Sequence, residues 1–261
     1  MGQNPGGKIM SAIQKGDFVE VEYTGSIKDT GDVFDTTDNT IAIEHNLDDG
    51  YKTFGPVIVC LGENMLLQGV EESLIGSEPG EFDFDVPAEK GFGKKRGDLV
   101  QLIPTSKFKK QGINPQPGYQ VNIDNSVGVI KTVTGGRTIV DFNHPLSGKD
   151  LHYSVKVNRV VTDKAEQIES LLKLKVGFQN LSVSVDENDV ATIDLTAQQL
   201  KQHLPDEVTQ KLKEEVLKVV SVKDVVFKQG VSSSDMPETP ATEEEAEKQA
   251  EKSEETGTDT Q

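Results

Sequence analysis

Acidic side chains are the first candidates for chemistry in this sequence, and two of them are spaced as a catalytic pair would be. Asp83 and Asp85 lie two positions apart in the alternating segment "EFDFDVP", so they share one face of a strand. Phe82 and Phe84 occupy the opposite face, which favours a solvent-facing role for the two acids. The sequence therefore gives no specific indication of acid–base catalysis by paired carboxylates.

Metal, phosphate and nucleophile motifs are also weak. The glycine-rich "TGGRT" at 134–138 joins two expected strands and opens no helix, so it is typical of a hairpin turn rather than a phosphate cradle. No Ser-His-Asp or Cys-His arrangement stands out. We expect no metal and no cofactor, because no metal-ligand spacing connects Cys60 with the four histidines, His45, His144, His152 and His203.

One aromatic residue is placed unusually. In "VPAEKGFGKKRGDLVQLIP" (86–104), Phe92 stands between two glycines, just before the basic run Lys94-Lys95-Arg96. Glycine neighbours allow turn conformations and provide no side chains that would bury the ring locally. This pattern predicts a ring displayed on a loop, with simple local packing as the alternative.

Composition limits the class of protein. The 261 residues include no Trp and a single cysteine, which allows no internal disulfide and fits a reducing cytosol. The N-terminus lacks a signal-peptide pattern, and no apolar run approaches the roughly 18 to 20 residues of a membrane span. A net charge of −17 argues against nucleic acid as the main partner, although residues 93–142 alone carry +5 beside −13 for residues 1–92. We expect a cytoplasmic protein that binds neither membrane nor nucleic acid.

Hydrophobic periodicity predicts three structural units and a tail. The first has a half-buried strand in "DFVEVEYTG", with Val19 on one face and Phe18, Glu20 and Glu22 on the other, a short strand ending at Phe34, a buried strand within 55–62, a helix within 64–76 and a strand at 81–86. Residues 93–142 read as four short strands with one helical turn, after which the alternating segment 150–160 resumes the first unit, so 93–142 resembles an insertion. The third unit combines a helix from 163, a hairpin at 187–188, a helix over 196–220 broken at Pro205 and a strand at 224–229. The acidic segment after it is expected to be disordered.

Five motifs in order resemble the FKBP family of peptidyl-prolyl isomerases: "YTG" (23–25), "VFD" (33–35), "LGENMLLQGVEESLIG" (61–76), "VPAEKGFG" (86–93) and "LHYSV" (151–155). The block between "GFG" and "NHPLSGK" is similar to the insert-in-flap domain of SlyD-type and archaeal FKBPs, and the third unit to the C-terminal extension of the long archaeal members. The resemblance implies an α+β fold, in which an antiparallel sheet wraps a short helix and carries an inserted small β-rich domain and a C-terminal α/β extension. The implied boundaries are 9–92 plus 143–162 for the isomerase domain, 93–142 for the insert, 163–231 for the extension and 232–261 for the tail.

The resemblance also implies a site. In such proteins an apolar pocket isomerises X-Pro bonds without a cofactor. By matching position, the Leu67 N–H would bind a substrate carbonyl and Asp35 would accept a hydrogen bond from Tyr23. The alternative is that Asp35 is only a turn residue. The implied pocket residues are Tyr23, Phe34, Asp35, Val57, Leu66, Leu67, Phe92, Leu146 and Tyr153. Departures from the family pattern are Phe92 for Tyr, Val70 for Trp and Tyr153 for Phe, which disfavour tight macrolide binding. The tail lacks the His and Cys residues with which SlyD relatives bind metal.

The expected partners are unfolded or partly folded proline-containing polypeptides, held by the insert. Its candidate apolar surface comprises "LVQLI" (99–103), "VGVI" (127–130) and Phe108, each of which equally fits an internal core. One alternative is a holdase chaperone with little isomerase activity. Another is a structural or assembly protein that oligomerises through its third unit. Whichever function holds, the sequence predicts a homodimer through 163–231, because a short hairpin is too small to cover the helical positions Ile168, Leu171, Leu172, Leu212, Val216 and Val219.

Overall fold

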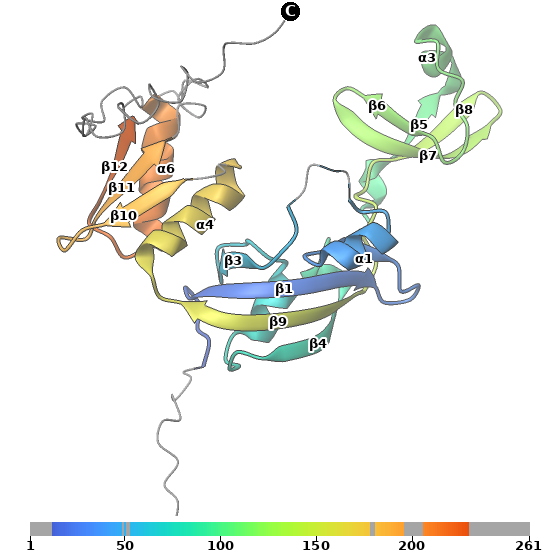
Figure 1. The fold of residues 1–261 in the computed structure, drawn as a ribbon. Helices are drawn as coiled ribbons and strands as arrows, with labels where there is room; N and C mark the ends of the chain where they lie inside the picture. Colours follow the sequence, from blue (N-terminus) through green and yellow to red (C-terminus); the bar gives the residue numbers. More distant parts are fainter. Residues whose placement is uncertain (1–11, 49, 51–52, 178–180, 196–205, 230–261) are drawn as a thin grey trace, which may run out of the picture.

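The computed structural model of the chain describes residues 12–48, 50, 53–177, 181–195 and 206–229 (Figure 1). Within these residues the chain forms three β-sheets with accompanying helices, and most strand pairs are antiparallel. The predicted α+β class is confirmed. No helix in the described ranges is long and apolar enough to cross a membrane. The predictions for the acidic tail and for residues 196–205, including the break at Pro205, lie outside the described residues.

The first sheet is antiparallel, with the order β2-β1-β9-β4 and with β3 paired to the first half of β1. Helix α2 (Gln68–Leu74) covers its inner face, where Val70 and Leu74 are buried. The predicted helix within 64–76 thus begins only at Gln68, after a loop. The strands are β1 (Phe18–Ile27), β2 (Val33–Thr36), β3 (Val57–Cys60), β4 (Glu81–Val86) and β9 (Leu151–Val161).

Short helical segments connect these strands. Helix α1 (Asn39–Glu44) was not predicted, because it has six residues and buries only Ala42. It is capped by Asp38, whose carboxylate accepts hydrogen bonds from the N–H groups of Thr40 (2.7 Å) and Ile41 (3.0 Å). Two 3₁₀ turns, η1 (Ala88–Lys90) and η2 (Gly97–Leu99), flank Phe92 in the chain.

The second sheet lies in the chain between β4 and β9, which are themselves paired in the first sheet. Its antiparallel order is β5-β8-β7-β6, which agrees with the four predicted strands. Phe108, on the helical turn α3 (Thr105–Lys110), is 1% exposed and belongs to this sheet's core, so it offers no client surface. The strands are β5 (Val100–Pro104), β6 (Gln120–Ile123), β7 (Ser126–Thr134) and β8 (Arg137–Asp141).

The third sheet has the order β10-β11-β12. Strands β10 and β11 form the predicted hairpin, whereas β12 runs parallel to β11 after a crossover through α6. Both helices of this unit pack beside the sheet in Figure 1, at the opposite end of the first sheet from the second sheet. The elements are β10 (Ser182–Val185), β11 (Val190–Leu195), β12 (Asp224–Gln229), α4 (Lys164–Val176) and α6 (Asp206–Val219).

The third unit also packs against the first sheet, and this bears on two expectations. Phe18, on the strand face that also carries Glu20 and Glu22, is 2% exposed because it lies in one core with α4 and α6. Helical positions that were thought to need a second copy are already buried there within one chain: Ile168, Leu171, Leu172, Leu212 and Val216. The argument for a homodimer from uncovered apolar residues is therefore wrong, and the dimer itself stays a prediction.

Replacement of Phe18 tests this shared core. Phe18→Ala should lower the free energy of unfolding by about 3–5 kcal/mol, because it removes a buried ring and leaves a cavity. Urea denaturation followed by far-UV circular dichroism measures the loss. Val100→Ala serves as the control, since Val100 is 42% exposed on the second sheet. A loss below about 1 kcal/mol for Phe18→Ala would show that the ring is not buried between the units.

Candidate functional site

A cleft of about 490 Å³ lies between the start of α2 and the inner face of the first sheet. This volume falls within the roughly 300–1,000 Å³ of small-ligand sites. Of the nine predicted site residues, only Val57 is not part of the lining, although it packs against the same core. The lining comprises Tyr23, Phe34, Asp35, Asn64, Met65, Leu66, Leu67, Val70, Phe92, His144, Leu146 and Tyr153.

Aromatic rings from four separate segments form the walls of the cleft. Phe34 lies edge-on to Phe92, with centroids 5.9 Å apart, and to Tyr153 at 6.0 Å. Tyr23 adds a tilted contact with Tyr153 at 6.2 Å. Edge-to-face geometry is favourable for aromatic pairs, so the rings hold one another in place. Gly25 is required beneath them, because a Cβ there would approach Phe34 Cζ to 2.8 Å.

One carboxylate and one phenol give the cleft its polar feature. The Tyr23 hydroxyl donates to Asp35 Oδ2 at 3.0 Å, and the Thr36 N–H donates to Asp35 Oδ1 at 3.1 Å. Burial, followed by the negative charge of Asp35, raises the pKa of Tyr23 well above its ordinary value, and burial does the same for the pKa of Tyr153. Both phenols are therefore neutral at physiological pH. Asp35 therefore accepts the predicted hydrogen bond from Tyr23, and the alternative that it is only a turn residue is wrong, because it lies within β2.

Phe92 is held on its loop by contacts from the segment that follows the second sheet. The Ser147 hydroxyl donates to the Phe92 carbonyl at 3.1 Å, and Gly93 takes a left-handed conformation with φ 75°. The His144 ring stacks on Phe92, with centroids 4.5 Å apart and planes within 6°. Sequence reasoning missed His144, because the histidines were weighed only as metal ligands. The sequence signal for His144 was its position two residues before Leu146, which is itself a predicted cleft residue.

The loop of residues 62–67, here called the pocket loop, precedes α2 and forms part of the cleft wall. Buried Glu71 accepts hydrogen bonds from the backbone N–H groups of Gly62 (3.0 Å), Met65 (3.2 Å) and Leu66 (3.4 Å). Leu67 caps α2, and none of the hydrogen bonds among the described residues uses its N–H. The Leu67 N–H is thus available to an acceptor in the cleft.

The site contains hydrogen-bonding and apolar groups but no arrangement suited to metal chemistry. In the described ranges, no group of three His, Cys, Asp or Glu side chains is placed to bind a metal ion. The cleft can hold a small apolar ring against its aromatic walls and offer one backbone N–H. Such a site can bind and reshape a ligand, but it holds no evident nucleophile.

A scan against known families matches residues 101–146 to the family described as "FKBP26, IF domain". This range covers β5 to β8 and reaches His144 and Leu146 of the cleft. The match therefore falls on the second sheet and its return to the first.

Curated proteins resemble a longer part of the chain. The short-type peptidyl-prolyl cis-trans isomerase of Methanocaldococcus jannaschii is 33% identical over 159 residues, covering 60% of this chain and 100% of that protein. The FKBP-type peptidyl-prolyl cis-trans isomerase SlyD of Treponema pallidum is 29% identical over 159 residues, covering 59% and 81%. The FKBP-type 16 kDa peptidyl-prolyl cis-trans isomerase of Escherichia coli K12 is 32% identical over 108 residues, covering 39% and 72%.

The buried phenols predict an alkaline loss of stability. Their pKa values are raised on folding, so the unfolded chain releases these protons first, near pH 10. Stability is then fully present below pH 10 and falls as pH rises above it, by up to about 1.4 kcal/mol per pH unit for each phenol. Tyr23→Phe should make this fall shallower, as measured by urea unfolding between pH 8 and 11.5. Tyr119→Phe, at a 53% exposed position, should leave it unchanged; equal slopes in all three proteins would contradict the prediction.

Proposed function

Because this chain belongs to the FKBP-type peptidyl-prolyl cis-trans isomerase family and is such an isomerase, we propose that it acts on X-Pro bonds in the cleft between α2 and the first sheet. The observation that carries this placement is the convergence of Tyr23, Phe34, Phe92 and Tyr153 around Asp35. The free Leu67 N–H lies on the opposite wall as a donor for a substrate carbonyl.

The chemistry of amide rotation explains why a site of this kind suffices. The C–N bond of an X-Pro peptide has partial double-bond character, and its rotation barrier is about 18–20 kcal/mol. Twisting the bond removes the resonance, so the twisted amide carries less separated charge than the planar one. A pocket lined by aromatic rings and poor in water therefore favours the twisted state over the planar state. No proton transfer, nucleophile or cofactor is required.

The energetic demand on the cleft is moderate. Shortening the isomerisation time from about 100 s to about 10 ms requires ~10⁴-fold acceleration, or roughly 5–6 kcal/mol. In our proposal the rings hold the prolyl ring, the Leu67 N–H orients a carbonyl and the neutral Tyr23 phenol satisfies Asp35. Ring placement, differential solvation and one hydrogen bond together supply energies of this order.

The domain division forms part of the proposal. We assign residues 9–92 with 143–162 to the isomerase domain, 93–142 to an insert-in-flap domain and 163–231 to a C-terminal extension, followed by the acidic tail at 232–261. Support comes from the separate cores of the first and second sheets. A cytoplasmic location remains part of the same proposal, on the basis of the single cysteine.

The second proposed activity is a chaperone function of the insert. Val100 and Leu102 are exposed on β5, as is Val127 on β7. The strand register places Leu102 beside Ile139 on β8, and both point away from the sheet's own core. We define the insert face as the apolar residues on this side: Val100, Leu102, Val127, Val129 and Ile139. An open apolar face of this kind supports binding of extended segments of unfolded, proline-containing chains. A holdase with little isomerase activity is the alternative for this face.

Removal of the flap ring tests the cleft. Phe92→Ala should lower kcat/KM on a short X-Pro peptide by about 10- to 100-fold, because burial of such a ring against substrate is worth about 1.5–3 kcal/mol. A protease-coupled assay measures the rate, and circular dichroism verifies the fold. Tyr119→Ala removes an exposed ring just before β6, outside the cleft lining, and should leave the peptide rate unchanged. An unaltered rate in folded Phe92→Ala would remove this cleft from the mechanism.

A second pair of variants tests the chaperone proposal. Leu102→Ser combined with Val127→Ser should abolish most suppression of client aggregation, measured by light scattering, since it makes the insert face polar. The rate on a tetrapeptide should be retained, because neither residue lines the cleft. Val226→Ser, at a 41% exposed position on β12, is the matched control and should keep full suppression. Unchanged suppression in the double variant would place client binding elsewhere.

A further inference from the structure

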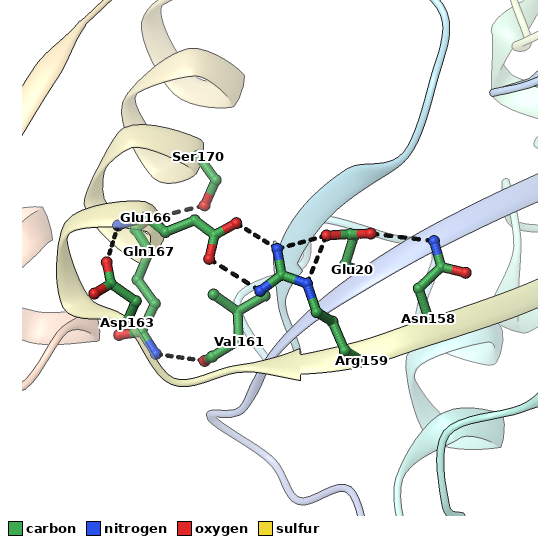
Figure 2. Close-up of polar contacts among 8 residues, drawn as sticks. All are labelled: Glu20, Asn158, Arg159, Val161, Asp163, Glu166, Gln167 and Ser170. Atoms are coloured by element: carbon green, nitrogen blue, oxygen red, sulfur yellow. Dashed lines mark hydrogen bonds and ion pairs between the residues drawn. The ribbon is translucent and has the colours of Figure 1, made fainter.

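The third unit packs directly against the first sheet, through ion pairs, hydrogen bonds and a shared core. Arg159, on β9, contacts Glu20 on β1 at 2.6 Å and also pairs with Glu166 on α4 (Figure 2). Asp163 caps α4 by accepting from the Glu166 N–H at 2.8 Å, and Gln167 donates to the Val161 carbonyl at 2.8 Å. The first turn of α4 is thereby fixed against the ends of β1 and β9.

A shared apolar core continues this attachment toward the cleft. Phe18 and Cys60 of the first sheet lie in one core with α4 and α6. Met65, in the pocket loop, packs against this core and also against the inner core that contains the cleft residues. Its sulfur accepts a hydrogen bond from the Cys60 N–H at 3.2 Å. Met65 therefore contacts both the third unit and the candidate site.

An ion pair adds a direct contact between α6 and the pocket loop. Lys218 Nζ, in the last turn of α6, lies 2.7 Å from Glu63 Oε2. Asn64, the next residue, takes a left-handed conformation with φ 56°, and residues 64–67 line the cleft. Glu71 holds the same loop from within the isomerase fold. The loop is thus held from two sides, and one side belongs to the third unit.

We propose that Glu63 and Lys218 are positioning residues for isomerisation, through which the third unit sets the pocket loop and with it the Leu67 N–H. The inference rests on the proposed cleft. The pair is partly exposed, with 27% of the Glu63 side chain and 67% of the Lys218 side chain accessible. Its contribution to global stability is therefore small, and its effect is local to the loop.

Charge variants in the full chain test the proposal. Lys218→Glu faces Glu63 with a like charge and should lower kcat/KM on a tetrapeptide about two- to five-fold, mainly through kcat. Combining it with Glu63→Lys reverses the pair and should restore the rate. The ratio of wild-type to variant rates should approach one at 1 M NaCl, where the screening length is about 3 Å. Amide NMR signals of residues 62–67 should shift in Lys218→Ala.

Lys213→Ala is the matched control, because Lys213 lies on the same helix but pairs with Asp224 inside the third unit at 2.6 Å. It should change neither the rate nor the loop signals. Equal losses in the Lys213 and Lys218 variants would indicate general loosening of the unit and overturn the positioning role. Unchanged rate and loop signals in both Lys218 variants would also overturn it.

Phe92→Ala, assayed in parallel, separates the two proposals. A rate lost in Phe92→Ala but kept in Lys218→Glu overturns only the positioning role. A rate kept in Phe92→Ala overturns the cleft as the site, and the positioning role with it.

Discussion

The backbone pairing of β9 with β1 on one side and β4 on the other is the interaction on which the arrangement depends. Tyr153, within β9, supplies a wall of the cleft. The chain enters this strand from the second sheet and leaves it toward α4, where Arg159 and Val161 meet the third unit. Eleven residues of one central strand thus place both appended units relative to the cleft.

The cleft proposed as the active site matches the modest electrostatic needs of amide rotation. That reaction moves no proton, so such a site has to hold rings away from water, whereas acids and bases would only add desolvation costs. The single carboxylate, Asp35, is accordingly satisfied by Tyr23 and by a backbone N–H. Because Gly25 has no side chain, the rings of Phe34 and Tyr153 can pack directly on the sheet surface.

The two appended units differ in how completely they bury their apolar residues. The third sheet has two long helices and the first sheet to cover its apolar residues, so its core is closed within one chain. The second sheet has a single six-residue helix, which supplies Phe108 to one face and leaves Leu102 and Val127 exposed on strands of the other. A small sheet with one covering turn cannot bury both faces, and this geometric limit leaves the insert face exposed.

The sequence by itself determined the local features of this protein. Alternation predicted β9, and short segments between turn residues predicted the four strands of the second sheet. The glycines around Phe92 predicted a ring on a loop, and the family resemblance supplied nine site residues, of which all but Val57 line the cleft. The sequence did not predict α1, whose six residues carry no periodic signal. Only the tertiary structure decided the burial of Phe18, the stacking of His144 on Phe92 and the pairing of Lys218 with Glu63, which are 155 positions apart. Such contacts depend on which faces of distant elements pack together, and hydrophobic periodicity marks a face as buried without specifying the partner that buries it.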